Sequence, residues 1–151
     1  NIWQRAYVSL LGLLPSASPE VIYLQTSFDD GGESLSGNCS YTLSGEVPDA
    51  RYWSYAIYGN DNYYLQDPNS LFDEPTFDDL FAQVTNGSEL TSIIGENYII
   101  KIDNNLINQN GTLSHFGNDF TLIYRIYGPN LNYYENPISI PVASIINEGC
   151  K

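Results

Sequence analysis

The 151-residue sequence contains no methionine, so as given it does not begin at its own start codon. Asn1 is also too large a residue to follow routine removal of an initiator methionine. We therefore expect that an upstream segment has been removed, and a signal peptide is the simplest candidate, although a larger precursor would leave the same trace. No apolar run approaches the roughly 18 residues of a membrane span. The sequence predicts a secreted or extracellular domain with no membrane span.

Positive charge is also scarce. Five Lys and Arg residues stand against 18 Asp and Glu, which gives a formal net charge of −13. Nucleic acids and anionic membranes both require a basic face on the protein that binds them. This balance excludes both as partners, and it favours solubility and mutual repulsion between copies.

The groups that carry most enzyme chemistry are few. His115 is the only histidine, and no Gly-x-Ser-x-Gly motif is present, which argues against a catalytic triad. Acidic pairs at 29–30, 73–74 and 78–79 fall in expected loops or at a helix start, where solvated surface is the simplest interpretation. Asn60, Asp61, Asn62 and Asp67 lack the spacing of a calcium loop. We predict a protein without enzymatic activity, metal site or cofactor.

Only two cysteines occur, Cys39 and Cys150, and a separation of about 110 residues matches no metal-ligand spacing. In an oxidising compartment this pair predicts a disulfide, with two independent thiols as the alternative. Closing so long a loop stabilises a fold by up to about 4–5 kcal/mol in the chain-entropy model.

Three N-glycosylation motifs are present, at Asn38, Asn86 and Asn110. Asparagine is so frequent here that their number is close to chance. Asn86 and Asn110 are each followed by glycine, which indicates exposed turns that can carry a glycan. The motif at Asn38 includes Cys39, which we expect to be bonded.

Alternation of apolar and polar residues dominates the chain after its amino-terminal segment. Strands are predicted at 21–28, 40–43, 51–58, 62–65, 97–103, 119–127 and 138–145. Gly- and Asn-rich turn signals separate them. Seven strands at this spacing predict an all-β fold, a two-sheet sandwich or jelly roll that forms a single domain over 1–151.

Two segments have helical spacing instead. Apolar residues between Trp3 and Leu11 recur on one helical face until Gly12 and Pro15, which predicts an amino-terminal helix. A capping threonine and early acidic residues predict one short helix at 76–84.

Tyrosine is abundant, and the segment 51–58 alternates large aromatic residues. Because side chains of a strand alternate between its faces, Trp53, Tyr55 and Ile57 are expected inside. The other face should then carry Tyr52, Ser54 and Ala56. Exposed tyrosines elsewhere suit a protein interface or a sugar-stacking platform.

Several motifs together resemble an uncharacterised family, domain of unknown function twelve-fourteen. Its opening element resembles the Arg5-Ala6 helix ending at Gly12, followed by Pro19, Glu20 and Tyr23. Its first hairpin resembles Asp29, Gly32, Leu35, Gly37, Tyr41 and Leu43. Its two further strand motifs resemble 52–58, which contains Tyr-Trp-Ser, and 122–129, which ends in Tyr-Gly-Pro. The resemblance implies a β-sandwich and supplies no established catalytic residues.

The leading hypothesis from these features is an extracellular structural glycoprotein that assembles into a filament, coat or surface layer. Strand edges and terminal segments can supply such contacts. We predict contacts at Ile2, Trp3 and Tyr7, and at Ile138 and Ile140 in a terminal edge strand. The alternative is a non-enzymatic carbohydrate- or small-ligand-binding module that stacks its ligand on Trp53 and the tyrosines. A third hypothesis is a hydrolase that uses a buried acidic pair.

Overall fold

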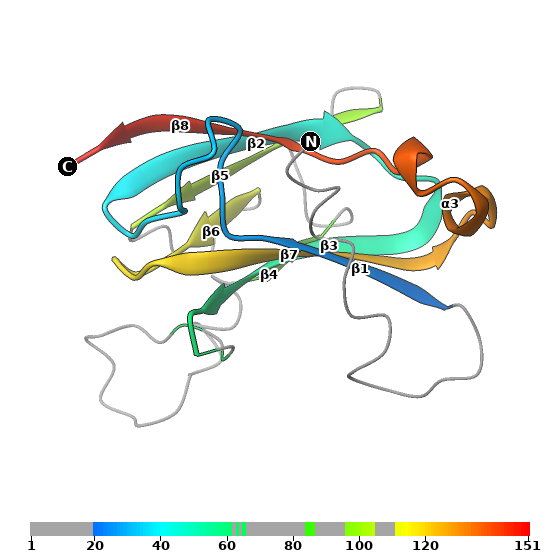
Figure 1. The fold of residues 1–151 in the computed structure, drawn as a ribbon, viewed down its shortest axis with the longest axis horizontal. Coiled ribbons are helices and arrows are strands. Elements are labelled where there is room, and N and C mark those ends of the chain that lie inside the picture. Colours follow the sequence, from blue (N-terminus) through cyan, green and yellow to red (C-terminus); the bar gives the residue numbers. More distant parts are fainter. Residues whose placement is uncertain (1–19, 62, 64, 66–83, 87–95, 105–110) are drawn as a thin grey trace.

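The computed structural model describes residues 20–61, 63, 65, 84–86, 96–104 and 111–151 (Figure 1). Strands make up most of this part of the chain. The elements are β1 (Val21–Thr26), β2 (Cys39–Glu46), β3 (Ala50–Gly59), β4 (Val84–Asn86), β5 (Asn97–Asp103), β6 (Thr112–Ser114), β7 (Phe120–Pro129), α3 (Asn132–Glu135), the 3-10 helix η1 (Pro137–Ser139) and β8 (Ser144–Cys150).

The strands form two four-stranded sheets, one in the order β1-β7-β3-β4 and the other in the order β6-β5-β2-β8. The two sheets lie one above the other in Figure 1, and α3 lies at one end, on the connection from β7 to β8. All pairs of strands are antiparallel except β5 and β6. The predicted all-β, two-sheet fold is therefore confirmed.

Alternation along the strands builds the core between the sheets. Trp53, Tyr55 and Ile57 of β3 are buried as predicted, and Tyr52 on the other face is 41 % exposed. Ser54 and Ala56 share that outer face but are buried as well. Their side chains are short, and β3 lies between two other strands, β7 and β4. Alternation therefore decides on which face of the sheet a side chain lies. Its burial also depends on how far the side chains of the neighbouring strands extend over it.

Three tyrosines lie at the centre of the core. The hydroxyls of Tyr55 and Tyr98 are 2.7 Å apart in a hydrogen bond between the two sheets. The ring of Tyr55 stacks on that of Tyr124, with centroids 4.4 Å apart and planes 6° apart. Burial raises the pKa of all three hydroxyls, so they stay protonated at neutral pH. Much of the tyrosine content is therefore structural.

The predicted strand at 138–145 is wrong in its placement. Pro137 opens the helix η1, and β8 begins only at Ser144 and runs to Cys150. Pro137 and Pro141 have no backbone N–H to give to a ladder, and the N–H groups of Ser139 and Ile140 bond within the turn of η1. The strand β8 therefore begins only after Pro141.

The predicted strand at 62–65 is not found where the structure describes it. Tyr63 lies in a bend, where its carbonyl accepts a bond from the N–H of Gly59 (2.8 Å) and its N–H donates to Asp61 (3.0 Å). These local bonds close a turn after β3. The predicted amino-terminal helix lies outside the described residues. So does the helix at 76–84 apart from Val84, which begins β4.

Where the structure describes the chain, no helix is both long enough and apolar enough to cross a membrane.

Candidate functional site

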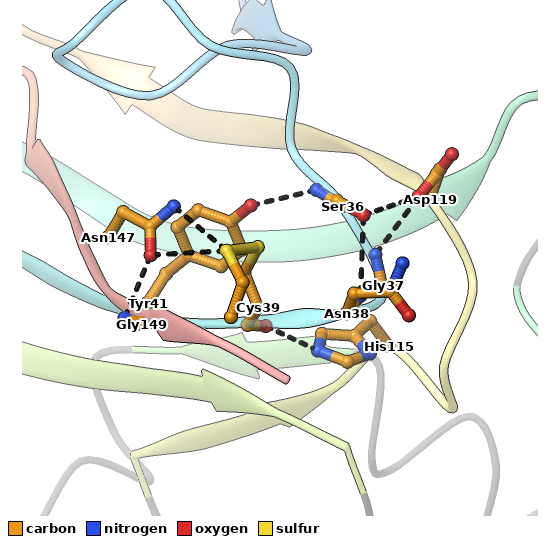
Figure 2. The surroundings of a disulfide bond; sticks show 10 residues. Ser36, Gly37, Asn38, Cys39, Tyr41, His115, Asp119, Asn147 and Gly149 are labelled. Carbon is orange, nitrogen blue, oxygen red and sulfur yellow. Dashed lines mark hydrogen bonds between the residues drawn. A yellow bond between two sulfur atoms is a disulfide. The ribbon is translucent and has the colours of Figure 1, made fainter.

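A disulfide joins the first residue of β2 to the last residue of β8 (Figure 2). Cys39 and Cys150 lie directly opposite each other in the antiparallel ladder, with Cα atoms 3.9 Å apart and sulfur atoms 1.98 Å apart. Cys39 is buried and Cys150 is exposed. The predicted disulfide is confirmed, and it closes a separation of 111 residues.

His115 lies beside the disulfide and is 1 % exposed. The backbone N–H of Gly117 donates to its Nδ1 (3.0 Å), so the ring proton lies on Nε2, which donates to the carbonyl of Cys39 (2.8 Å). The ring also stacks on Phe120. Burial lowers the pKa of His115, and both ring nitrogens are occupied. The histidine holds the turn against the disulfide and has no nitrogen left for proton transfer.

Asp119 fixes the turn before Cys39. Its Oδ1 accepts the hydroxyl of Ser36 (2.9 Å) and the N–H of Gly37 (3.1 Å) (Figure 2). A Cβ on Gly37 would lie 2.2 Å from the carbonyl carbon of Gly117, so only glycine fits between the two turns. The turns on either side of the disulfide are therefore packed backbone to backbone.

Asp103 completes the polar group around the disulfide. Burial acts to raise its pKa, but hydrogen bonds from the Asn104 N–H and the Ser40 hydroxyl and the charge of Lys151 outweigh it and lower the pKa. Lys151 also donates its backbone N–H to the carbonyl of Asn38 (2.8 Å). We call the residues Cys39, Asp103, His115, Asp119 and Cys150 the disulfide cluster. Its contacts hold the last residues of the chain in place.

The outer edge of β8 carries contacts that sequence analysis missed. The N–H of Asp30 donates to the carbonyl of Ile145 (3.0 Å), and the hydroxyl of Ser144 donates to the carboxylate of Asp30. Further along, Oδ1 of Asn147 accepts the N–H of Gly149 (2.9 Å). The Asn-Glu-Gly motif at 147–149 was a usable signal, because asparagine often bonds its own backbone two residues on.

The other predicted site residues are scattered. Asn38 is exposed in the turn before β2, Asn86 lies in β4, and Asn110 lies outside the described residues. Ile138 is 77 % exposed, but Ile140 is only 6 % exposed and belongs to the core. Ile140 as a contact residue is therefore wrong, because it has too little surface to meet a neighbour. Ile2, Trp3 and Tyr7 also lie outside the described residues.

Trp53 as a stacking platform is wrong as well. The indole is 5 % exposed and packs against Tyr98, with ring centroids 4.5 Å apart. A sugar cannot stack on a ring that is covered by the protein. Tyrosines do reach the surface elsewhere, at Tyr23 (47 % exposed), Tyr52 and Tyr63 (74 %).

A shallow depression of about 460 Å³ opens where β8 separates from β2, beyond the pair Ser44 and Ser144. Its lining includes Ser44, Glu46, Asn97, Ile99, Pro141 and Val142. Where the structure describes the chain, no group of three or more His, Cys, Asp or Glu residues is placed to hold a metal ion.

These features define a two-sheet β domain whose carboxyl end is fastened by a disulfide. The chain belongs to the family described as "Protein of unknown function (DUF1214)", whose model matches residues 20–131. The resemblance inferred from the sequence motifs is confirmed. The match ends before α3, η1 and β8, so Cys150 lies beyond it.

Two solved structures are similar in fold. The VPA0106 protein from Vibrio parahaemolyticus is 21 % identical, with a TM-score of 0.66 over 84 % of this chain and 31 % of that one. A putative uncharacterized protein from Burkholderia cenocepacia is 11 % identical, with a TM-score of 0.56 over 87 % of this chain and 31 % of that one. The chain thus spans about a third of their length. No curated protein matches.

Proposed function

We propose that this domain is a non-catalytic structural module of an extracellular, oxidising compartment, and that its role is to associate with other copies as a subunit of a filament, coat or surface layer. The observation that carries the proposal is the end of the molecule formed by α3 and η1. Leu131 just before α3 is 70 % exposed, and Ile138 in η1 is 77 % exposed. Large apolar side chains this exposed favour a contact surface.

Few acidic residues belong to the last part of the sequence, although Asp49 also lies at this end of the molecule, where its carboxylate accepts a hydrogen bond from Asn130 beside Leu131. Of the 18 acidic residues, only Asp119, Glu135 and Glu148 follow residue 103. Between 120 and 151, the two acids Glu135 and Glu148 are balanced by the two bases Arg125 and Lys151. Copies that carry a net charge of −13 repel one another, so salt should strengthen a contact made at this end of the molecule.

A role without catalysis agrees with the disulfide cluster. The single histidine is buried and uses both ring nitrogens for hydrogen bonds, and both cysteines are joined. A disulfide that fastens a terminal strand suits a durable protein in an oxidising compartment. Asn38 is exposed in its turn, so a glycan at this position meets no steric barrier within the chain.

The experiment that tests the proposal is sedimentation velocity over a concentration series at about 0.15 M and higher salt. The parent chain should associate, and salt should strengthen the association. The double variant Leu131→Ser and Ile138→Ser should associate less, whereas the control Tyr63→Ser, also at a highly exposed residue, should match the parent. A parent that stays monomeric at all concentrations and salt conditions would contradict the proposal.

A second candidate, a small-ligand-binding module, is favoured by the depression beside Glu46. Antiparallel geometry turns the N–H and C=O of Glu46 toward the side where β8 has left β2, so they remain available for a ligand. A thermal-shift screen of mono- and disaccharides tests this candidate. A stabilisation that disappears in Val142→Trp, which fills the depression, would support it. No response from any sugar would count against it.

A further inference from the structure

The strand β1 is an edge strand with one side unpaired. It pairs antiparallel with β7 from Val21↔Tyr127 to Thr26↔Leu122, and no described strand pairs with its other side. The N–H of Gly128 donates to the carbonyl of Glu20 (2.7 Å). In an antiparallel ladder, alternate residues turn both backbone groups to the same neighbour. Even-numbered residues of β1 therefore bond to β7.

The odd-numbered residues Val21, Tyr23 and Gln25 consequently turn their N–H and C=O groups outward. The next residue in this series, Ser27, confirms the direction, because its carbonyl accepts the N–H of Leu35 (2.8 Å) on the outer side. The open edge thus runs over 21–25 and ends where the 34–35 segment covers it. Tyr23 at its centre is 47 % exposed.

Within the part of the chain that the structure describes, this open edge lacks the usual defences of edge strands. Its sequence, Val-Ile-Tyr-Leu-Gln-Thr, has no charged residue, no proline and no glycine. Natural proteins block edges with charges, prolines, bulges or covering loops, because an unblocked edge is a template for another strand. An uncharged edge is conspicuous in a chain with 18 acidic residues.

We infer that β1 pairs antiparallel with β1 of a second copy across a two-fold axis. The inference rests on the proposed function and names one contact of the assembly. In the register that uses the whole open edge, Tyr23 lies opposite its own counterpart and Val21 lies opposite Gln25. Each outward residue then donates one hydrogen bond and accepts one, and the two β1-β7-β3-β4 sheets become continuous.

The same register keeps the carboxylates apart. Glu20 lies opposite Thr26 of the second copy, and Asp29 and Asp30 lie beyond the paired stretch. Tyr23 meets Tyr23 on the outer face, and aromatic cross-strand pairs are favourable. Repulsion between the copies is therefore limited to charges outside the contact, and salt screens it.

A two-fold contact closes on itself and gives a dimer only. A filament or layer therefore requires a second surface, and the end of the molecule that carries Leu131 and Ile138 is well placed to provide it, because α3 lies beyond the ends of the strands (Figure 1). The dimer is the building block in this scheme.

The test uses Tyr23→Lys and Tyr23→Glu in the 151-residue chain, measured by sedimentation velocity at about 0.15 M salt. Each variant alone places like charges opposite each other and should weaken dimerisation about tenfold or more. An equimolar mixture places Lys opposite Glu and should restore the dimer. An effect of net charge alone would move the two variants in opposite directions. Tyr63→Lys and Tyr63→Glu are the matched controls and should dimerise like the parent.

Tyr23→Pro provides a second test, because it removes an N–H that β7 does not use and should leave the monomer folded by circular dichroism. It should dimerise more weakly than the parent. If these Tyr23 variants dimerise like the parent, or if the Lys and Glu mixture fails to restore the dimer, the pairing of β1 is wrong. Association that depends only on Leu131 and Ile138 would overturn this inference and leave the proposed function standing, whereas a monomeric parent would overturn both.

Discussion

Two of the four edge strands, β1 and β8, end their sheets in opposite ways. On the outer edge of β8 the carbonyl of Ile145 accepts the N–H of Asp30, and further along the side chain of Asn147 bonds the N–H of Gly149 within the strand. The disulfide at Cys150 fastens the end of the strand to β2 on the paired side. A register shift opposite Ser40 and Tyr41 interrupts its ladder further. The edge of β1 has none of these features over 21–25. The comparison shows that one small domain can block one edge and leave the other available for pairing.

The difference has a local cause in sequence. The end of β8 contains Asn147, Glu148 and Gly149, which bend the strand and add charge, and every residue from Ile146 to Cys150 is exposed. In β1, buried residues alternate with less buried ones, so the strand stays regular. Regularity preserves the row of outward backbone groups that a second strand needs.

The largest expected effect on stability comes from removing the disulfide that joins β8 to β2. The double variant Cys39→Ser and Cys150→Ser should lose about 2–5 kcal/mol in free energy of unfolding, because the unfolded chain regains the entropy of a long loop. Urea denaturation measures this loss. Amide exchange at 146–150 should also accelerate.

The variant should stay folded at room temperature, because Ile145 is the only buried side chain of β8 and the other residues of the core cluster lie outside this strand. Loss of the whole near-ultraviolet circular dichroism spectrum would contradict this, as would a stability equal to that of the parent.

A pair of neighbouring substitutions compares the inner and outer faces of β8. Ile145 is 1 % exposed and Ile146 is 47 % exposed. Ile145→Ala should cost about 2–4 kcal/mol, since it removes buried methylene groups and leaves a cavity. Ile146→Ala should change stability by no more than about 0.5 kcal/mol. Equal effects of the two substitutions, measured by thermal and urea unfolding, would mean that the facing of β8 is misassigned.

Acid should loosen the disulfide cluster through His115. Burial lowers the pKa of His115 below its ordinary value of 6.5, so the unfolded chain binds a proton more readily than the folded one. Stability is therefore full above pH 6.5 and falls as pH drops below it, by at most about 1.4 kcal/mol per pH unit. The pKa of Asp103 is lowered below 3.8. Its contribution to stability is therefore full above that value and is lost only at lower pH.

His115→Gln should flatten the pH dependence just below pH 6.5 in urea titrations, because the amide does not titrate. Asp103→Asn should keep a pH dependence in that window, because His115 is still present and loses a carboxylate charge that raises its pKa, and this separates the two groups. A parent whose stability is constant from pH 7 to pH 5 would contradict the buried neutral state of His115.

The smallest expected effect on stability concerns Asn147, whose side chain accepts a hydrogen bond near the end of β8. Asn147→Ala removes the acceptor of the Gly149 N–H and should cost about 0.5–1.5 kcal/mol, less if water replaces the bond. Gln25→Ala on the open edge of β1 is the control and should change the stability of the monomer little, because this exposed side chain has no described bond to lose. Thermal melts of dilute samples compare the two.

Alternation of apolar residues was sufficient to predict the two-sheet fold, the interior face of β3 and, with the cysteine count, the disulfide. It was not sufficient at 138–145, where Pro137 and Pro141 displaced the strand toward the carboxyl end and buried Ile140. The long-range hydrogen bonds between side chains could not be predicted either. Asp119 and Ser36 meet across 83 residues, and Asp30 and Ser144 meet across 114, and neither residue in these pairs carries a local signal of its partner.

The open edge was also missed for a physical reason. Sequence shows that 21–28 is a strand, but only the pairing order shows that it ends a sheet, and only the bond from Gly128 to Glu20 shows which residues face outward. Edge position is a property of topology, and a single strand pattern does not contain it.

The most direct test of the contrast between the two edges is residue-resolved amide hydrogen exchange on the parent chain at low and high protein concentration. At low concentration the amides of Val21, Tyr23 and Gln25 should exchange fast, because their N–H groups face solvent. At high concentration these three should become protected, while Ile22, Leu24 and the closed edge of β8 should keep the same rates. Protection that appears along β8 and not at Val21, Tyr23 and Gln25 would contradict the account.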